Sequence, residues 1–185
     1  MFKIGNLKIG NGLPPVIILD LGINHHGSLE KAIYLSDLAI KSGAKIIKHQ
    51  THIAEEEMSI EAKKIIPANA NISIFSLIKR FSLSYSEEEK LMKYIKQKKC
   101  IFISTPFSKA AVDRLVKFKV PAFKIGSGEC NNYPLIKYIC SKKKPIILST
   151  GMNDIKSISK SVKIIRDYKL PYALLHCTNI YPTPP

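Results

Sequence analysis

Short runs of apolar residues recur along the chain, and each is bounded by polar residues or glycine. The runs are continuous rather than alternating, which is typical of parallel strands that are buried on both faces. They predict six strands, at Val16–Leu21, Ala44–Lys48, Cys100–Ser104, Ala122–Ile125, Pro145–Ser149 and Tyr172–His176.

Amphipathic segments separate these apolar runs. The first, Ser28–Ser42, opens on a serine that can cap a helix. Another, Ser86–Lys98, opens on Ser-Glu-Glu-Glu, which places acidic groups at the positive end of a helix dipole. The same pattern predicts further helices at Ser108–Phe118, Pro134–Cys140 and Asp154–Lys169.

This alternation of strands and helices predicts an α/β protein with a parallel sheet and right-handed crossovers. A doubly wound open sheet and a closed barrel both fit the alternation. Neither GxGxxG nor GxxxxGK[ST] follows the first strand, which disfavours a nucleotide-binding open sheet. Polar residues follow nearly every strand, as the active site of a (β/α)8 TIM barrel requires. We therefore predict a TIM barrel whose mouth is the carboxyl-terminal end of its strands.

The number of strands falls short of a closed barrel, which needs eight strands and about 250 residues. We therefore expect residues 1–185 to be the N-terminal part of a barrel domain, with about six of eight βα units. The first and last strands would then have unpaired edges, which favour aggregation. Residues 1–13 are expected to form a leading hairpin. Residues 51–84 are expected to form an unusually long loop over the mouth.

The net charge of +15 and the isoelectric point near 9.7 raise the question of an anionic partner. Nearly all basic residues are lysines, and the arginines are only Arg80, Arg114 and Arg166. Because base readout favours arginine, we expect no nucleic-acid partner. A positive field could still concentrate an anionic substrate.

Membrane association and disulfide bonds are not expected. No stretch approaches the roughly 20 apolar residues of a membrane span. The first apolar run is interrupted by Asp20 and does not resemble a signal peptide. The four cysteines lack CxxC spacing, which indicates reduced thiols in a cytoplasmic protein, with Cys100 and Cys177 in strand-like apolar runs.

Two lysines, Lys48 and Lys124, end apolar strands, where an ammonium group is costly unless it meets an anion. Each could form an ion pair with a carboxylate, for which Asp20 or Glu129 would serve. The alternative, which we favour, is a shared anion-binding mouth to which hydroxyl groups also contribute, from Thr105, Ser127 and Ser149. Nearby glycines would let backbone amides approach a phosphate.

Asp20 and Glu129 are the candidate acid–base carboxylates, with pairing to the lysines as the competing interpretation. Gln50 follows Lys48 by two residues and could bind a sugar hydroxyl at the same mouth. The histidine pairs do not predict a metal site, because His25 and His26 are adjacent and project differently. His49 and His52 lie in a strand-to-loop stretch, where loop hydrogen bonding is the simpler expectation.

Six motifs, in order along nearly the whole chain, resemble the N-acetylneuraminate (sialic acid) synthase family. They are Asp20–Gly27, Ala44–Thr51, Ser104–Phe107, Phe123–Glu129, Ser149–Met152 and Thr178–Pro184. Each motif is weak by itself, whereas the ordered set is specific. The stretch His49–Ser59 is more similar to the sialic acid branch than to the pseudaminic or legionaminic branches.

The resemblance implies condensation of phosphoenolpyruvate with N-acetylmannosamine, with release of phosphate. It implies that Asp20 and Glu129 lie at the reacting carbons, and that the amino sugar contacts Gln50, Asn69 and Tyr181. Phosphoenolpyruvate would be held by Lys48, Thr105, Lys124, Ser127, Ser149 and Asn179.

The resemblance also implies a divalent metal, Mn²⁺ or Mg²⁺, and a homodimer. The two histidine ligands of that metal would lie beyond residue 185, as would the last strands and a small C-terminal domain. Asp20 stands where the family usually has glutamate, which shortens the reach of the carboxylate by about one carbon–carbon bond.

Two alternatives to an active sialic acid synthase stay open. One is a truncated, non-catalytic fragment of such an enzyme, and the other is a synthase for legionaminic or pseudaminic acid. The DNA sequence beyond codon 185 addresses the first alternative. A phosphate-release assay with different acetamido sugars addresses the second.

Overall fold

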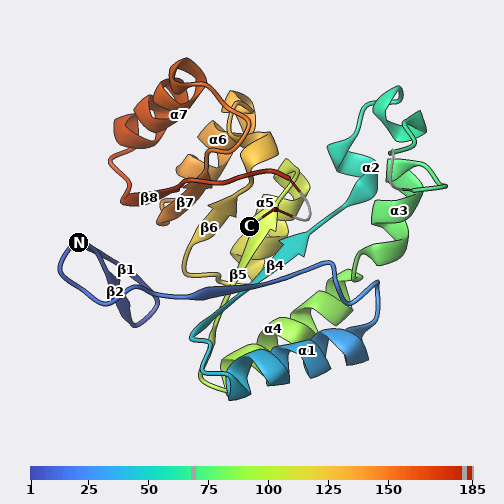
Figure 1. Ribbon diagram of the computed structural model, residues 1–185, viewed down its shortest axis with the longest axis horizontal. Helices are drawn as coiled ribbons and strands as arrows, with labels where there is room; N and C mark the ends of the chain where they lie inside the picture. The colour runs from blue at the N-terminus through green and yellow to red at the C-terminus, as the bar shows by residue number, and fades with distance from the viewer. Residues whose placement is uncertain (68–69, 181–182, 185) are drawn as a thin grey trace. The chain divides into compact units, whose positions relative to one another are not determined.

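The computed structural model describes residues 1–67, 70–180 and 183–184. The chain divides into two compact lobes. The first lobe is Val16–Val120, and the second lobe combines Met1–Pro15 with Pro121–Pro185. Figure 1 labels the helices and strands of both lobes.

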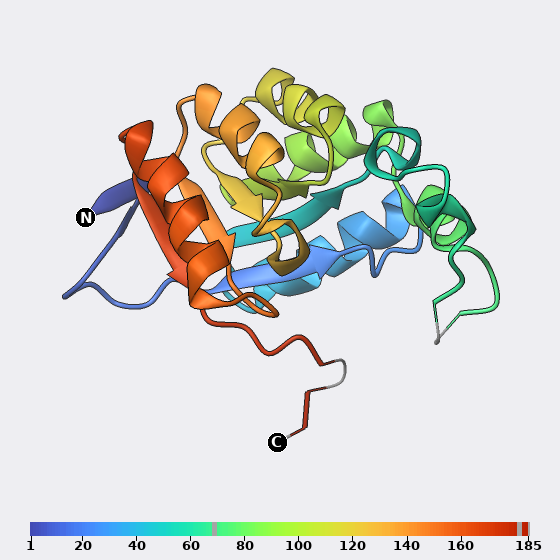
Figure 2. The ribbon, with the colours of Figure 1, turned by 90° about the horizontal axis from the view of Figure 1, so that it is seen from above.

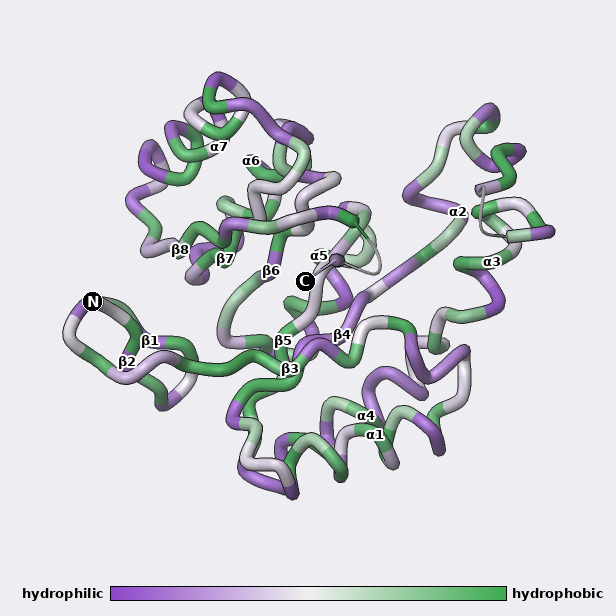
Figure 3. The backbone as a smooth tube through the Cα atoms, viewed as in Figure 1, coloured by the Kyte–Doolittle hydropathy of each residue, from purple (hydrophilic) through white to green (hydrophobic). Residues whose placement is uncertain are grey.

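Three parallel strands form the sheet of the first lobe, with the middle strand in sequence also in the middle of the sheet. They are β3 (Ile18–Gly22), β4 (Ile46–Thr51) and β5 (Ile101–Pro106). The apolar start of β4 is fully buried, as the continuous apolar pattern predicts. Figure 3 shows the tube becoming hydrophilic in the second half of β4, toward α2.

Three longer helices cover this sheet, namely α1 (Leu29–Lys41), α4 (Tyr85–Gln97) and α5 (Lys109–Lys117). The start of α4 differs from the prediction at Ser86, because Ser84 is the N-cap. The Ser84 hydroxyl accepts a hydrogen bond from the Glu87 amide, and the Glu87 carboxylate accepts one from the Ser84 amide. This capping box moves the start of the helix by one residue.

Residues 51–84 contain more regular structure than the expected loop. They carry α2 (Ala54–Glu57), the 3₁₀ helix η1 (Ala62–Lys64) and α3 (Ile74–Phe81). The Ser73 hydroxyl caps α3 by accepting a hydrogen bond from the Ser76 amide. The excursion leaves the sheet at the carboxyl-terminal end of β4 (Figure 1).

The second lobe contains a hairpin and a second parallel sheet. The hairpin pairs β1 (Phe2–Ile4) with β2 (Leu7–Ile9) in antiparallel fashion. The parallel sheet has β7 between its two neighbours and comprises β6 (Phe123–Ile125), β7 (Ile146–Ser149) and β8 (Tyr172–Leu175).

Two helices and one 3₁₀ turn accompany the parallel sheet of the second lobe. They are η2 (Ser127–Glu129), α6 (Tyr133–Ser141) and α7 (Ile155–Asp167). The helices α6 and α7 lie side by side (Figure 2). Each helix buries part of its apolar surface, and Ile136, Ile139 and Ile165 are fully covered.

Within each of the two parallel sheets, every new strand pairs in parallel with the strand before it in the chain. A doubly wound sheet would reverse its strand order, whereas a barrel adds strands in sequence. The predicted fold class, an incomplete (β/α)8 barrel with about six βα units, is therefore confirmed. No helix in the described ranges combines the length and apolar character needed to span a bilayer.

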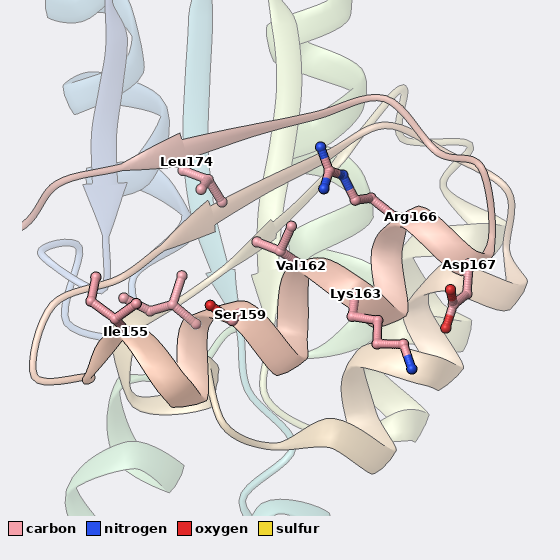
Figure 4. Close-up of a pocket in the computed structure, with 8 residues that line it drawn as sticks. Ile155, Ser159, Val162, Lys163, Arg166, Asp167 and Leu174 are labelled. Atoms are coloured by element: carbon pink, nitrogen blue, oxygen red, sulfur yellow. The ribbon is translucent and has the colours of Figure 1, made fainter.

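The second lobe carries an apolar hollow of about 410 Å³ between α7 and β8. Figure 4 shows Val162 of α7 directed toward Leu174 of β8, whereas Lys163 and Asp167 point away. The rims are open to solvent, because Ile155 is 78% exposed and Leu174 is 45% exposed. This lobe thus exposes a contiguous apolar surface beside β8.

Candidate active site

The second half of β4 directs its side chains to two different surroundings. Successive residues of a strand point to opposite faces. Lys48 and Gln50 therefore share one face with each other, whereas His49 and Thr51 share the other. The first face carries predicted substrate-binding residues, and the second carries a buried hydrogen-bond network.

Lys48 forms an ion pair with Asp20, which lies directly opposite it on β3. The Lys48 Nζ to Asp20 Oδ1 distance is 2.8 Å. The lysine side chain is only 10% exposed, whereas the aspartate is 57% exposed. The ion pair with a carboxylate, one of the two interpretations of Lys48, is therefore present. Its Asp20 carboxylate is open to solvent.

Gly22 allows several polar side chains to gather beside this ion pair. Its φ of +54° is in the left-handed region that favours glycine. A Cβ there would lie 3.5 Å from Asp20 Oδ1, 3.6 Å from Gln50 Nε2 and 3.9 Å from Asn24 Nδ2. Thr105 of β5 lies opposite Gln50 and is buried. The first lobe thus brings Asp20, Lys48, Gln50 and Thr105 to neighbouring strand ends.

The other face of β4 carries a chain of buried hydrogen bonds that the sequence did not reveal. The Gly27 amide donates to His25 Nδ1, and His25 Nε2 lies 3.1 Å from His49 Nε2. His49 Nδ1 lies 3.2 Å from Glu88 Oε1. The Glu88 carboxylate also accepts hydrogen bonds from Thr51 and from Arg114, with Arg114 Nη1 at 3.0 Å.

The donors and acceptors in this hydrogen-bond network fix the tautomers of His25 and His49. An amide can only donate, so His25 Nδ1 is an acceptor and His25 Nε2 carries the proton. His49 Nε2 accepts the hydrogen bond from His25 Nε2, so His49 donates from Nδ1 to Glu88. Burial, followed by the proximity of His49 and His26, lowers the pKa of His25 to about 4.

Glu88 is ionised within this network. Burial raises the pKa of the Glu88 carboxyl, but hydrogen bonds from His49, Thr51 and Arg114 lower it further than burial raises it. The network therefore ties the β3–α1 loop, β4, α4 and α5 together around one buried negative charge.

We expect stability to fall as the pH is lowered from about 6.5 to about 4. Below its ordinary pKa of 6.5, His25 binds a proton in the unfolded chain but not in the folded chain, where its pKa is about 4. The unfolded state then holds more protons, so the loss grows to about 3 kcal/mol through this window. Urea denaturation at pH 7, 6, 5 and 4 measures it. A His25→Gln variant with the same pH slope as the original chain would contradict the assignment.

In the second lobe, Lys124 of β6 is held by oxygen acceptors. Lys124 Nζ donates to Ser149 Oγ at 2.6 Å and to the Ile125 carbonyl at 2.9 Å. The lysine is 6% exposed, so its charge lies almost entirely out of bulk water. This arrangement places a desolvated cation at the carboxyl-terminal ends of β6 and β7.

Ser127 and Gly151 connect the loops that follow β6 and β7. The Gly151 amide donates to Ser127 Oγ at 3.1 Å. Asn153 Nδ2 donates to the Ser127 carbonyl at 2.8 Å and to the Gly151 carbonyl at 2.7 Å. A Cβ on Gly151 would overlap the side-chain oxygen of Asn179, so that residue lies against this turn. Lys124, Ser127, Ser149 and Asn179 are thus neighbours in the second lobe.

Cys177 is a member of this cluster that the sequence analysis assigned to an apolar strand. It follows β8 and is half-buried. Burial raises the pKa of its thiol, but hydrogen bonds from Ser149 and Ser127 lower it more, with a smaller contribution from Lys124. The surroundings therefore stabilise a negative charge at this position. The sequence could have pointed to Cys177 through its position two residues before Asn179, a predicted phosphoenolpyruvate ligand.

Glu129 lies in η2, where its carboxylate accepts a hydrogen bond from Asn132 Nδ2 at 2.7 Å. Asn132 caps α6, because its side-chain oxygen accepts from the Leu135 amide. The predicted sugar-binding residues Asn69 and Tyr181 lie outside the described residues. The catalytic and binding roles of all these residues stay predictions.

The metal implied by the resemblance finds no ligand set in the part of the chain that the structure describes. No three His, Cys, Asp or Glu side chains there are arranged to hold an ion. His25 and His49 use their ring nitrogens in the buried network. The expectation that the ligands lie beyond residue 185 stays a prediction.

Buried lysines and hydroxyls at the ends of barrel strands are typical of TIM-barrel enzymes that act on anionic substrates. Within this class the chain belongs to the NeuB family, whose model matches residues 35–185. The resemblance to the N-acetylneuraminate synthase family is thereby confirmed.

Relatives of stated function include a synthase of a legionaminic acid. The chain is 35% identical to the N,N'-diacetyllegionaminic acid synthase of Campylobacter jejuni, over 91% of this chain and 53% of that protein. It is 33% identical to the spore coat polysaccharide biosynthesis protein SpsE of Bacillus subtilis, over 100% of this chain and 50% of that protein. The chain therefore spans about half the length of these relatives.

A solved structure supports the same family and fold. The N-acetylneuraminic acid synthetase of Leptospira borgpetersenii, in complex with citrate, superimposes with a TM-score of 0.88 and 29% sequence identity. The match covers 99% of this chain and 61% of that chain.

Proposed function

We propose that the protein is a sialic acid synthase that condenses phosphoenolpyruvate with N-acetylmannosamine to give N-acetylneuraminate and phosphate. The observation that carries the proposal is the cluster of buried Lys124, Ser127 and Ser149 with half-buried Cys177 in a chain of the NeuB family. The cluster would hold the phosphate of phosphoenolpyruvate.

The electrostatics of the cluster support an anionic ligand. The same groups that lower the pKa of the Cys177 thiol would stabilise a phosphate by charge and by hydrogen bonds. The relative from Leptospira borgpetersenii is described as a complex with citrate, which is also a multivalent anion. Lys48 and Thr105 are kept as further candidate ligands of phosphoenolpyruvate.

The reaction requires proton transfers that carboxylates can perform. The enol carbon of phosphoenolpyruvate attacks the aldehyde carbon of the open-chain sugar, and the aldehyde oxygen gains a proton. Water adds to the resulting cationic carbon and loses a proton, after which the tetrahedral intermediate expels phosphate. Asp20 and Glu129 are the candidate acid and base. Lys48 would hold the Asp20 carboxylate in place until substrate binds.

A second candidate function is the synthesis of a legionaminic acid. The 35% identity to the Campylobacter jejuni enzyme favours it, since that relative is named for a diacetamido product. The acceptor would then be the corresponding diacetamido sugar, contacted by the same side chains. Gln50, Asn69 and Tyr181 are the candidates for discriminating the two sugars.

Calorimetric titration of the purified chain with phosphoenolpyruvate tests the proposal. We expect one binding site, with inorganic phosphate as a competitor. Titration of the loaded protein with N-acetylmannosamine and with the diacetamido sugar then separates the two candidate functions. A folded chain that binds neither phosphoenolpyruvate nor phosphate would contradict both.

Gly151→Ala is expected to weaken phosphoenolpyruvate binding about 10-fold, or about 1.4 kcal/mol. The added Cβ would overlap the Asn179 side chain and crowd the Cys177 carbonyl at 2.9 Å, so the segment after β8 must move away. Gly128→Ala is the matched control, because nothing lies within 4 Å of its added Cβ. Equal phosphoenolpyruvate affinities for the two variants would show that binding does not require the close contact between Gly151 and Asn179.

A further inference from the structure

A buried pair, His52 and Glu57, lies beside the predicted substrate-binding face of β4. His52 Nδ1 is 3.0 Å from both carboxylate oxygens of Glu57. The two side chains are only 6% and 5% exposed. Burying such a pair is costly unless other contacts compensate for the lost hydration.

The second ring nitrogen of His52 contacts Gln50. His52 Nε2 lies 3.1 Å from Gln50 Oε1. The imidazole also stacks on Phe107, with ring centroids 4.2 Å apart and an interplanar angle of 10°. The ring is therefore held by a carboxylate, an amide and an aromatic face, and it has little freedom to rotate.

The short helix α2 explains how Glu57 reaches this ring. The chain leaves β4 at Thr51, passes through His52 and turns through Ala54–Glu57. One helical turn brings Glu57 back over a residue five positions earlier. The segment after β4 thus begins with a helical turn that holds His52 next to the sheet.

The contacts of His52 define which end of the Gln50 amide faces the strand-end cluster. A carboxylate accepts hydrogen bonds, so His52 Nδ1 donates to Glu57. Gln50 turns its carbonyl oxygen to His52 and its nitrogen toward Gly22, beside the Asp20 carboxylate. The His52 ring thus contacts a carboxylate through Nδ1 and the Gln50 amide oxygen through Nε2.

We propose that the His52–Glu57 pair is a positioning device that holds the Gln50 amide with its N–H groups toward the substrate. Gln50 then recognises an oxygen acceptor on the amino sugar, either a hydroxyl or an acetamido carbonyl. The identity of the ligand rests on the proposed function, whereas the positioning of Gln50 does not.

Glu57→Gln tests the proposal, with Glu56→Gln as the matched control on the exposed face of the same helix. The first readout is the side-chain amide signal of Gln50 in nitrogen–proton NMR spectra, assigned with Gln50→Met. We expect a distinct, slowly exchanging pair of signals in the original chain and in Glu56→Gln, and averaged signals in Glu57→Gln. Unchanged Gln50 signals in Glu57→Gln would overturn the proposal.

The second readout is the affinity for N-acetylmannosamine or the diacetamido sugar in the presence of phosphoenolpyruvate. Glu57→Gln should weaken sugar binding about 10-fold and leave phosphoenolpyruvate affinity within about 2-fold. Because the pair acts through Gln50, the double variant Gln50→Met/Glu57→Gln should bind no more weakly than Gln50→Met. Additive losses would overturn the positioning role. If the original chain binds neither sugar, the proposed function fails, and the NMR readout still decides whether the pair positions Gln50.

Discussion

Glu88→Ala is expected to lower the free energy of unfolding by about 3–5 kcal/mol. The substitution removes the carboxylate that accepts hydrogen bonds from His49, Thr51 and Arg114. It leaves a largely buried guanidinium and buried donors without their acceptor, which costs more than the lost contacts alone. Urea denaturation at pH 7 measures the change.

Glu89→Ala is the matched control, because Glu89 is the next residue of α4 and pairs with Lys93 at the surface. An exposed i,i+4 pair contributes only about 0.3–0.5 kcal/mol. Similar losses for the two variants would mean that the buried network does not stabilise the first lobe.

Lys124→Met is expected to weaken phosphoenolpyruvate binding by about 10- to 150-fold. A charge-assisted hydrogen bond contributes about 1.5–3 kcal/mol, and the loss of the buried cation removes it entirely. Methionine keeps much of the side-chain volume, so the lobe should stay folded. Isothermal titration calorimetry measures the affinity, and circular dichroism checks the fold.

Lys137→Met controls for the loss of one positive charge, because Lys137 is an exposed residue of α6 in the same lobe. Its affinity should stay within about 2-fold of the original, since solvent and salt screen a surface charge. If both variants bind equally well, Lys124 is not a ligand of the phosphate.

Most of the regular structure could be predicted from the sequence because its signals are local. Continuous apolar runs located all six parallel strands, with boundaries that differ from the observed ones by a few residues. The start of α4 was placed two residues beyond its cap, since both Ser84 and Ser86 precede acidic residues and only the structure shows which one caps. The helix α3 was missed because it lies within an excursion that lacks the strand-to-helix alternation.

The candidate site was predictable in part, because strand-end position is a local property. Lys48 and Lys124 could be chosen from their place after apolar runs, and both are buried. The network that joins His25, His49 and Glu88 could not be predicted, because its members are up to 63 positions apart, from 25 to 88. Only the folded sheet and helices bring them together.

The role of Cys177 was missed for a related reason. Its neighbours in sequence suggested a buried strand, whereas its surroundings in the second lobe are hydroxyls and a lysine. Those surroundings also make it a reporter of the site.

The most direct test of the phosphate site is the rate at which Cys177 is alkylated by iodoacetamide, followed by mass spectrometry. The buried cysteines Cys100, Cys130 and Cys140 are internal references. We predict that saturating phosphoenolpyruvate slows the alkylation of Cys177 at least 10-fold, and that pyruvate, which lacks the phosphate, does not. An unchanged rate at saturating phosphoenolpyruvate would contradict the placement of its phosphate beside Lys124, Ser127 and Ser149.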